Sequence, residues 1–119
     1  MGPFDGQVWG PAVDTYEFED HFLVYVELPG VDSESVELSY LNGGLTIRGD
    51  KNPPTDAGEA DRTLHRERRF GTFCRTLELP GEVQAQDISA KYHAGVLEVT
   101  VKKLESQRPK AIKIDVQEA

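Results

Sequence analysis

A period-two alternation of apolar and polar side chains, interrupted by short turn-forming pairs, is the feature that most constrains how this chain can fold. In the first such run Phe22, Val24, Val26 and Leu28 share one row within residues 16–29. This is the pattern of a half-buried β-strand. Nowhere in the sequence do apolar residues recur at helical spacing over three turns. We therefore predict an all-β chain.

The same alternation recurs along the rest of the chain. It predicts strands at residues 36–40, 45–48, 71–79, 88–92 and 97–101. The turns between them are Pro29-Gly30, Asn42-Gly43-Gly44, Pro80-Gly81 and Ala94-Gly95, and a single helical turn is expected near residues 33–36. Short strands at a spacing of roughly 8 to 12 residues are typical of an immunoglobulin-like antiparallel β-sandwich.

The 119 residues allow one domain with short flanking segments. We expect a short N-terminal arm at residues 1–13, the sandwich domain at 14–104 and an extended C-terminal tail at 105–119. Within the domain, residues 50–61 (DKNPPTDAGEAD) have the composition of an exposed loop. A short irregular strand is expected within residues 62–70, so the whole connection at 50–70 is unusually long.

The charge balance excludes several classes of partner. The sequence has 13 lysines and arginines against 21 aspartates and glutamates, a formal charge of −8, which repels nucleic acid and anionic lipid. The first residues lack a signal-peptide pattern, and no apolar run reaches the roughly 20 residues that span a bilayer. The single cysteine, Cys74, cannot form an internal disulfide and fits a reducing compartment. A cytoplasmic protein that needs no membrane is the expectation.

Enzymatic function is not favoured. The histidines His21, His65 and His93 lie far apart and without metal-ligand spacing, and no nucleophile, phosphate-binding or dinucleotide motif is present. We expect no catalytic residue, metal or cofactor. The basic segment containing Arg62, Arg66, Arg68 and Arg69 is expected to pair with acids such as Glu59 and Asp61, in the same chain or in a partner.

Arg75 shares a row with the apolar residues Phe73, Leu77 and Leu79. A guanidinium on an apolar face is costly unless it is paired and hydrogen-bonded. Two interpretations stay open at this point. Either the side chain extends to solvent at the rim of the sheet, or it meets a carboxylate from a loop or a second subunit. Cys74 falls in the opposite row and is interpreted as a small strand residue.

Both ends of the chain carry apolar residues without an obvious partner. In the tail, Ile112 and Ile114 lie on one face of an extended segment, which either adds to a sheet edge of a neighbouring subunit or forms the last strand of the chain's own sandwich. The arm contains Phe4, Val8 and Trp9 among glycines and prolines. These three residues are either contacts for other proteins or simply unordered.

Several motifs, in their order and spacing, together resemble the small heat-shock protein family, built on the α-crystallin domain, and its bacterial and plant class in particular. The resemblance covers residues 13–116. It rests on Leu28-Pro29-Gly30-Val31, Leu45-Thr46-Ile47-Arg48-Gly49, His65-Arg66-Glu67-Arg68, Gly71-Thr72-Phe73-Cys74-Arg75, Leu79-Pro80, Ala90, Gly95-Val96-Leu97 and Ile112-Lys113-Ile114. The family differs at Ala94, where it often has asparagine or aspartate.

The resemblance implies an ATP-independent holdase that captures partly unfolded proteins before they aggregate, with no catalytic residue or cofactor. It also implies a homodimer, whose interface would contain Leu64, His65, Arg66, Glu67, Arg68 and Arg75, with residues 64–67 as a strand exchanged into the partner's sheet. Ile112 and Ile114 would dock in a groove of a neighbouring dimer, formed by Val36, Leu38, Tyr40, Ile88, Ala90 and Tyr92, and so build larger homo-oligomers.

Two questions stay open at this stage. The arm is shorter than the family's usual arm, so either the protein is a dimer or small oligomer or the chain has been trimmed. The alternative function is a monomeric co-chaperone adaptor, similar to the sandwich domain that binds the 90-kilodalton chaperone. The mass of the native protein distinguishes the two functions, because an adaptor of this kind is a monomer and the holdase is a dimer or a larger species.

Overall fold

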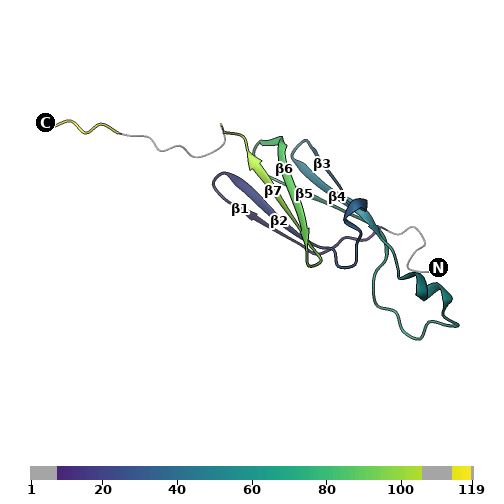
Figure 1. Cartoon of the computed structure of the whole chain (residues 1–119). Helices are drawn as coiled ribbons and strands as arrows, with labels where there is room; N and C mark the ends of the chain where they lie inside the picture. The colour runs from purple at the N-terminus through teal and green to yellow at the C-terminus, as the bar shows by residue number, and fades with distance from the viewer. Residues whose placement is uncertain (1–7, 106–113, 119) are drawn as a thin grey trace.

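The computed structural model, which describes residues 8–105 and 114–118, is a sandwich of two antiparallel sheets (Figure 1). This confirms the predicted fold class. The strands are β1 (Val13–Glu17), β2 (His21–Glu27), β3 (Glu37–Leu41), β4 (Gly44–Lys51), β5 (Gly71–Glu78), β6 (Val83–His93) and β7 (Val96–Lys103). Two short 3-10 helices, η1 (Ser33–Ser35) and η2 (Thr55–Glu59), lie between strands, and η1 confirms the helical turn expected near residues 33–36.

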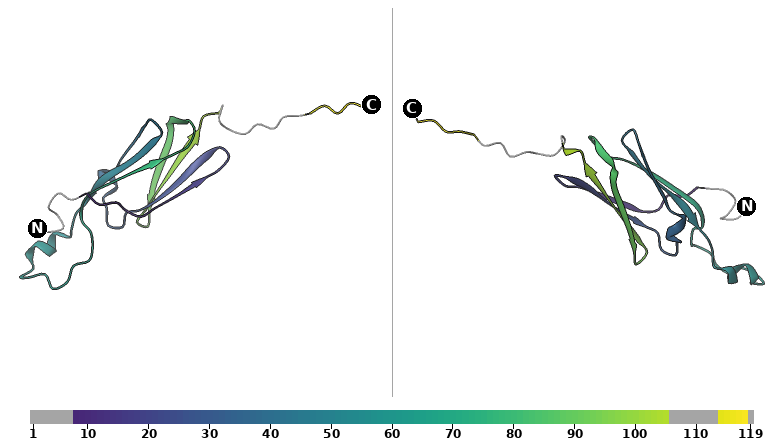
Figure 2. Two further views of the ribbon diagram at one scale, coloured as in Figure 1. Left: turned by 180° about the vertical axis from the view of Figure 1, so that it is seen from behind. Right: turned by 45° about the horizontal axis from the view of Figure 1, so that its top comes forward.

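One sheet has the strand order β1-β2-β7-β6 and the other has the order β3-β4-β5. The two layers can be followed in both views of Figure 2. Apolar side chains from the facing sides of the sheets make one core, because the period-two pattern sends alternate residues inward. The core consists of Phe22, Val24, Val26, Leu28, Val31, Leu45, Ile47, Phe73, Leu79, Leu97, Val99 and Val101.

Two tight hairpin turns use left-handed backbone conformations. Asn42 and Gly43 have φ of 49° and 83° between β3 and β4, and Ala94 and Gly95 have φ of 52° and 78° between β6 and β7. Positive φ at both central residues matches the right-handed twist of the flanking strands. Both turns lie where the sequence predicted them, although alanine is an uncommon residue in this conformation.

The structure corrects two predicted boundaries. The run at residues 16–29 is not one strand, because β1 ends at Glu17 and the chain turns before β2 begins at His21. Residues 13–17 were missed as a strand because four of the five are exposed and the segment lacks an apolar row. In addition, β6 begins at Val83, ahead of the predicted residue 88, with an irregularity in the pairing between Val83 and Ile88.

The connection between β4 and β5 leaves the sandwich and projects from one end of it (Figures 1 and 2). Residues 54–69 are all exposed. In this single chain the connection contains η2 but no strand, so the irregular strand expected at residues 62–70 is not formed. Among the described residues, no helix is long and apolar enough to cross a membrane.

Candidate interaction sites

An apolar groove runs between the two sheets, along the edge strands β3 and β6. It contains a hollow of about 240 Å³, lined by Leu38, Ser39, Tyr40, Leu45, Ala85 and Ile88. Leu38 and Tyr40 face inward, because they pair across β3 and β4 with the fully buried Ile47 and Leu45. The edges of the two sheets thus leave apolar side chains accessible between them.

Of the six residues predicted to form the groove, five lie on these two edge strands and Val36 directly precedes β3. Three of them, Leu38, Tyr40 and Ile88, line the hollow. Val36, Leu38, Tyr40, Ile88 and Tyr92 are half-buried and pack against the core. Ala90 lies in the same inward row as Ile88 and Tyr92, because it pairs with the buried Val99. Ala90 is nevertheless exposed, since a methyl group does not fill the space between the sheet edges.

The tail that was predicted to dock in such a groove is only partly described. Ile112 lies outside the described residues. Ile114 is 80% exposed and Val116 is 91% exposed, and residues 114–118 lie away from the sandwich in Figure 1. Both apolar side chains therefore have no cover within the described part of this chain, and no described residue of the tail lies in the groove.

Trp9 covers the free edge of β5. Its backbone N–H donates to the Thr72 carbonyl at 3.2 Å, and its own carbonyl accepts from the Cys74 N–H at 3.0 Å, which makes a parallel bridge to Phe73. The indole N–H donates to the Gly71 carbonyl at 3.3 Å. The Trp9 and Phe73 rings lie 5.6 Å apart at a tilt of 55°. Trp9, which was predicted as an arm contact, is thus half-buried against the domain.

The other two arm residues have different positions. Val8 is 59% exposed, and Phe4 lies outside the described residues. The position of Trp9 could not be predicted from the sequence, because its indole N–H bonds to a residue more than 60 positions away along the chain. Contact of these residues with client proteins stays a prediction.

Arg75 lies beside the same segment. It pairs in register with the buried Ile47, so it does share the apolar face as predicted. Its Nη1 donates to the Pro11 carbonyl at 3.1 Å. The residue as a whole is exposed, and no carboxylate among the described residues forms an ion pair with it. The acidic partner that one of the two interpretations expects is not among the described residues.

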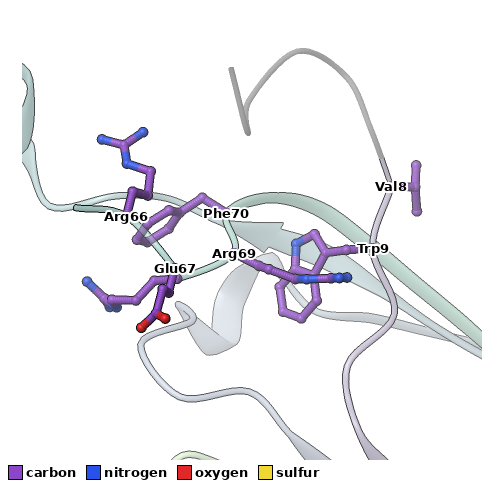
Figure 3. A pocket seen from close by; sticks show the side chains of 7 residues that line it. Val8, Trp9, Arg66, Glu67, Arg69 and Phe70 are labelled. Carbon is purple, nitrogen blue, oxygen red and sulfur yellow. The ribbon is translucent and has the colours of Figure 1, made fainter. Parts of the chain in front are cut away.

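A pocket of about 440 Å³ lies between the Trp9 segment and the end of the long connection (Figure 3). Its walls combine aromatic rings with charged side chains: Val8, Trp9, Arg66, Glu67, Arg68, Arg69 and Phe70. The guanidinium carbon of Arg68 is 4.9 Å from the centroid of the buried Phe70 ring. Three arginines against one glutamate make the lining of this pocket positive, whereas the chain as a whole is acidic.

Two residues near this pocket were not predicted from the sequence. Phe70 is buried at the end of the connection, and Lys51 is buried with its Nζ 5.9 Å from the Phe70 ring centroid. Burial, and secondarily repulsion from Arg68, lowers the pKa of Lys51. The burial of Lys51 could have been predicted from the alternation along β4, because every second residue from Leu45 to Lys51 faces inward.

The predicted interface residues 64–68 are all exposed. Leu64 is 82% exposed, and His65 and Glu67 lie close together, with His65 Nε2 and Glu67 Oε2 3.4 Å apart. Arg62, Arg68 and Arg69 form no ion pair with Glu59 or Asp61 among the described residues. Pairing of these groups with a second chain stays a prediction.

The comparison with known proteins agrees with this geometry. A model of the Hsp20/alpha crystallin family matches residues 14–117. Heat shock protein 16 of Schizosaccharomyces pombe is 41% identical over 105 residues, which are 84% of this chain and 71% of that protein. A 17.6 kDa class II heat shock protein of Arabidopsis thaliana is 32% identical over 107 residues, covering 87% of this chain and 69% of that one.

Solved structures give the same result. Heat shock protein 16.0 from Schizosaccharomyces pombe has a TM-score of 0.75 at 35% identity, covering 91% of this chain and 98% of that chain. The hspA protein from Xanthomonas axonopodis has a TM-score of 0.72 at 37% identity, covering 82% and 96%. Fold, motifs and relatives agree, and the chain belongs to the Hsp20/alpha crystallin family of small heat-shock proteins.

Proposed function

We propose that this chain is an ATP-independent holdase, which binds partly unfolded proteins and prevents their aggregation under heat or other stress. The observation that carries the proposal is the open apolar groove between β3 and β6. Both of its walls are edge strands with unpaired backbone groups, next to half-buried apolar side chains. An unfolded chain offers what such a site binds: extended backbone with apolar side chains on alternate residues.

The tail is proposed to occupy the same groove when no client is bound. Ile112 and Ile114 have the two-residue spacing of a strand, and Ile114 has no cover in the described chain. Docking into a neighbouring dimer would hide both the isoleucines and the groove. Heating weakens such a small contact and exposes the groove, so activation by stress requires no nucleotide.

The dimer is proposed to form through the long connection. Four strands lie at sheet edges, of which β3 and β6 flank the groove and β5 is covered by Trp9. This leaves β1 as the edge with no neighbour among the described residues. Residues 64–67 are exposed and form no strand in one chain, and they would complete the sheet of a second chain at β1. Arg75 would meet a carboxylate of that chain.

The proposed activity is binding alone and uses no catalytic residue or cofactor. Among the described residues, no cluster of histidine, cysteine, aspartate or glutamate side chains could hold a metal ion. The net charge of −8 would keep client complexes soluble. We propose the cytoplasm as the compartment, on the basis of the single cysteine.

A light-scattering assay tests the proposal. A heat-labile client enzyme is warmed with increasing amounts of the protein and no ATP, and the mass of the protein is recorded by multi-angle scattering. The proposal predicts suppression near equal subunit ratios by a dimer or a larger species. A monomer that leaves aggregation unchanged would favour the adaptor function, and a dimer without suppression would also contradict the holdase.

A deletion tests the role of the tail. Removal of residues 108–119 is expected to lower the oligomer mass or to change client binding, because it removes both isoleucines. If neither changes, the tail does not occupy the groove.

A further inference from the structure

Two cations meet at the base of the long connection between β4 and β5. Lys51 is the last residue of β4, and Arg68 lies two residues before Phe70, which directly precedes β5. Both cations lie over one ring, because Lys51 Nζ is 5.9 Å and the guanidinium carbon of Arg68 is 4.9 Å from the centroid of Phe70. Neither side chain forms an ion pair with a carboxylate among the described residues. The two ends of the connection thus place two positive charges together without a counter-charge from the described chain.

The carboxylates that lie nearest in sequence are engaged elsewhere. Asp50 precedes Lys51, but it belongs to the opposite face of β4, where its Oδ1 accepts from Thr72 Oγ1 at 2.8 Å. Asp32 caps η1, where its Oδ1 accepts a backbone N–H at 3.0 Å. Lys51 is only 8% exposed, and a buried ammonium group without a counter-charge is costly. The chain therefore leaves at this point a cation that an anion from outside would stabilise.

Gly30 leaves an open space between the two cations. The residue is exposed, and its φ of 75° favours glycine over any residue with a side chain. A Cβ at this position would lie 3.7 Å from Lys51 Cε and 3.9 Å from Arg68 Nη2, and beyond the neighbouring residues no other atom lies within 4 Å. A small group that enters this space from solvent would therefore contact both cations at once.

We propose that the space over Gly30 binds a phosphate group, either free or as a phosphomonoester, held between Lys51 and Arg68. A phosphomonoester carries about −1.5 to −2 charges at neutral pH, which matches two cations, whereas a carboxylate neutralises only one. The guanidinium supplies paired donors and the ammonium supplies a compact charge. The bound group removes the repulsion between Lys51 and Arg68 and joins the two ends of the connection. No residue that lines the groove between β3 and β6 takes part, so the site is independent of the proposed holdase activity.

Equilibrium dialysis with radiolabelled inorganic phosphate tests the site on the full chain, at neutral pH and constant ionic strength. Wild type is expected to bind phosphate saturably, with one phosphate per copy of the chain. Lys51→Met and Arg68→Gln each remove a charged hydrogen-bond donor, so each is expected to raise the dissociation constant about tenfold or more.

Matched variants control for the loss of positive charge elsewhere on the chain. Lys91→Met, at a lysine whose side chain is 75% exposed on β6, and Arg48→Gln, at an exposed arginine of β4, make the same chemical changes away from Gly30. Both are expected to leave the dissociation constant within about twofold, because salt screens distant charges. Circular dichroism verifies folding. Arg68 is itself exposed, so Arg68→Gln keeps the test decisive even if Lys51→Met does not fold.

Competing anions identify the bound group and its source. Methyl phosphate competes with inorganic phosphate if the site accepts a phosphomonoester, and it fails to compete if the site accepts the free ion alone. Acetate is expected to compete at least tenfold less well than either. Three results would overturn the site: no saturable binding by wild type, equal binding by all four variants, or acetate that competes as well as phosphate. None of them would bear on suppression of client aggregation, which is measured separately.

Discussion

Gly49→Ala is the substitution whose effect follows most directly from the packing. Gly49 lies in the buried row of β4, where the strand pairs with Phe73 of β5. A methyl group at this position would be 2.5 Å from Phe73 Cζ and 2.9 Å from Cε2, and 3.1 Å from the Ser35 carbonyl oxygen. The Phe73 ring is fully buried, so it cannot move without displacing the core.

Two opposing effects determine how much Gly49→Ala changes the free energy of unfolding. Overpacking of a close-packed core costs about 1–3 kcal/mol, and contacts this short belong at the upper end. Loss of glycine's freedom in the unfolded chain offsets about 0.5 kcal/mol. The free energy of unfolding should therefore fall by about 2 kcal/mol. For a domain of this size, the melting temperature falls by about 10 °C.

The assay is denaturation by urea at fixed protein concentration, followed by the fluorescence of the only tryptophan, Trp9, which packs against Phe73. Gly58→Ala is the control, because a methyl group there would meet nothing within 4 Å. Phe73→Leu should relieve the clash, so the double variant should be less destabilised than the sum of the single ones. Equal stability of Gly49→Ala and Gly58→Ala, or strict additivity with Phe73→Leu, would refute the reasoning.

Three further predictions concern a turn, a buried cation and the interface. Ala94→Asn should raise the free energy of unfolding by about 0.5–1 kcal/mol, because asparagine tolerates the φ of 52° better than alanine does; equal urea midpoints would contradict this. Lys51→Met should be more stable than wild type at neutral pH, where burial disfavours the charged lysine. Since the pKa of Lys51 is lowered by folding, the unfolded chain keeps its proton to higher pH than the folded chain does. The free energy of unfolding of wild type should therefore approach that of Lys51→Met as the pH rises toward the ordinary lysine pKa. A difference between the two proteins that is the same at pH 7 and pH 10 would contradict this prediction. Arg75→Glu should split or distort the dimer, because it removes the bond to the Pro11 carbonyl and reverses the charge offered to a second chain; unchanged mass together with an unchanged melting temperature would exclude that role.

The hairpins could be predicted because their information is local. Asn42 and Gly43 determine a tight turn by themselves, and the flanking residues alternate strictly between core and solvent. The lining of the hollow follows the same alternation, since Leu38, Tyr40 and Ile88 fall in the inward rows of two edge strands. Docking of a tail or a client there stays a prediction.

The features that were missed depend on distant parts of the chain. β1 is a strand because it pairs with β2, and its own exposed residues contain no apolar row. Trp9 is fixed by backbone bonds to β5, and Lys51 is buried by Phe70 from the far end of the connection. The strand expected within residues 62–70 does not form in one chain.

The groove itself can be tested with one pair of variants on one strand. Ala90→Glu places a carboxylate at an exposed position in the inward row of β6, two residues from Ile88, which lines the groove, whereas Ser89→Glu adds the same group to the opposite face of β6. Each is compared with wild type in the ATP-free client aggregation assay. We expect Ala90→Glu to lose most of the suppression and Ser89→Glu to keep it. Equal suppression by both folded variants would contradict client binding in this groove.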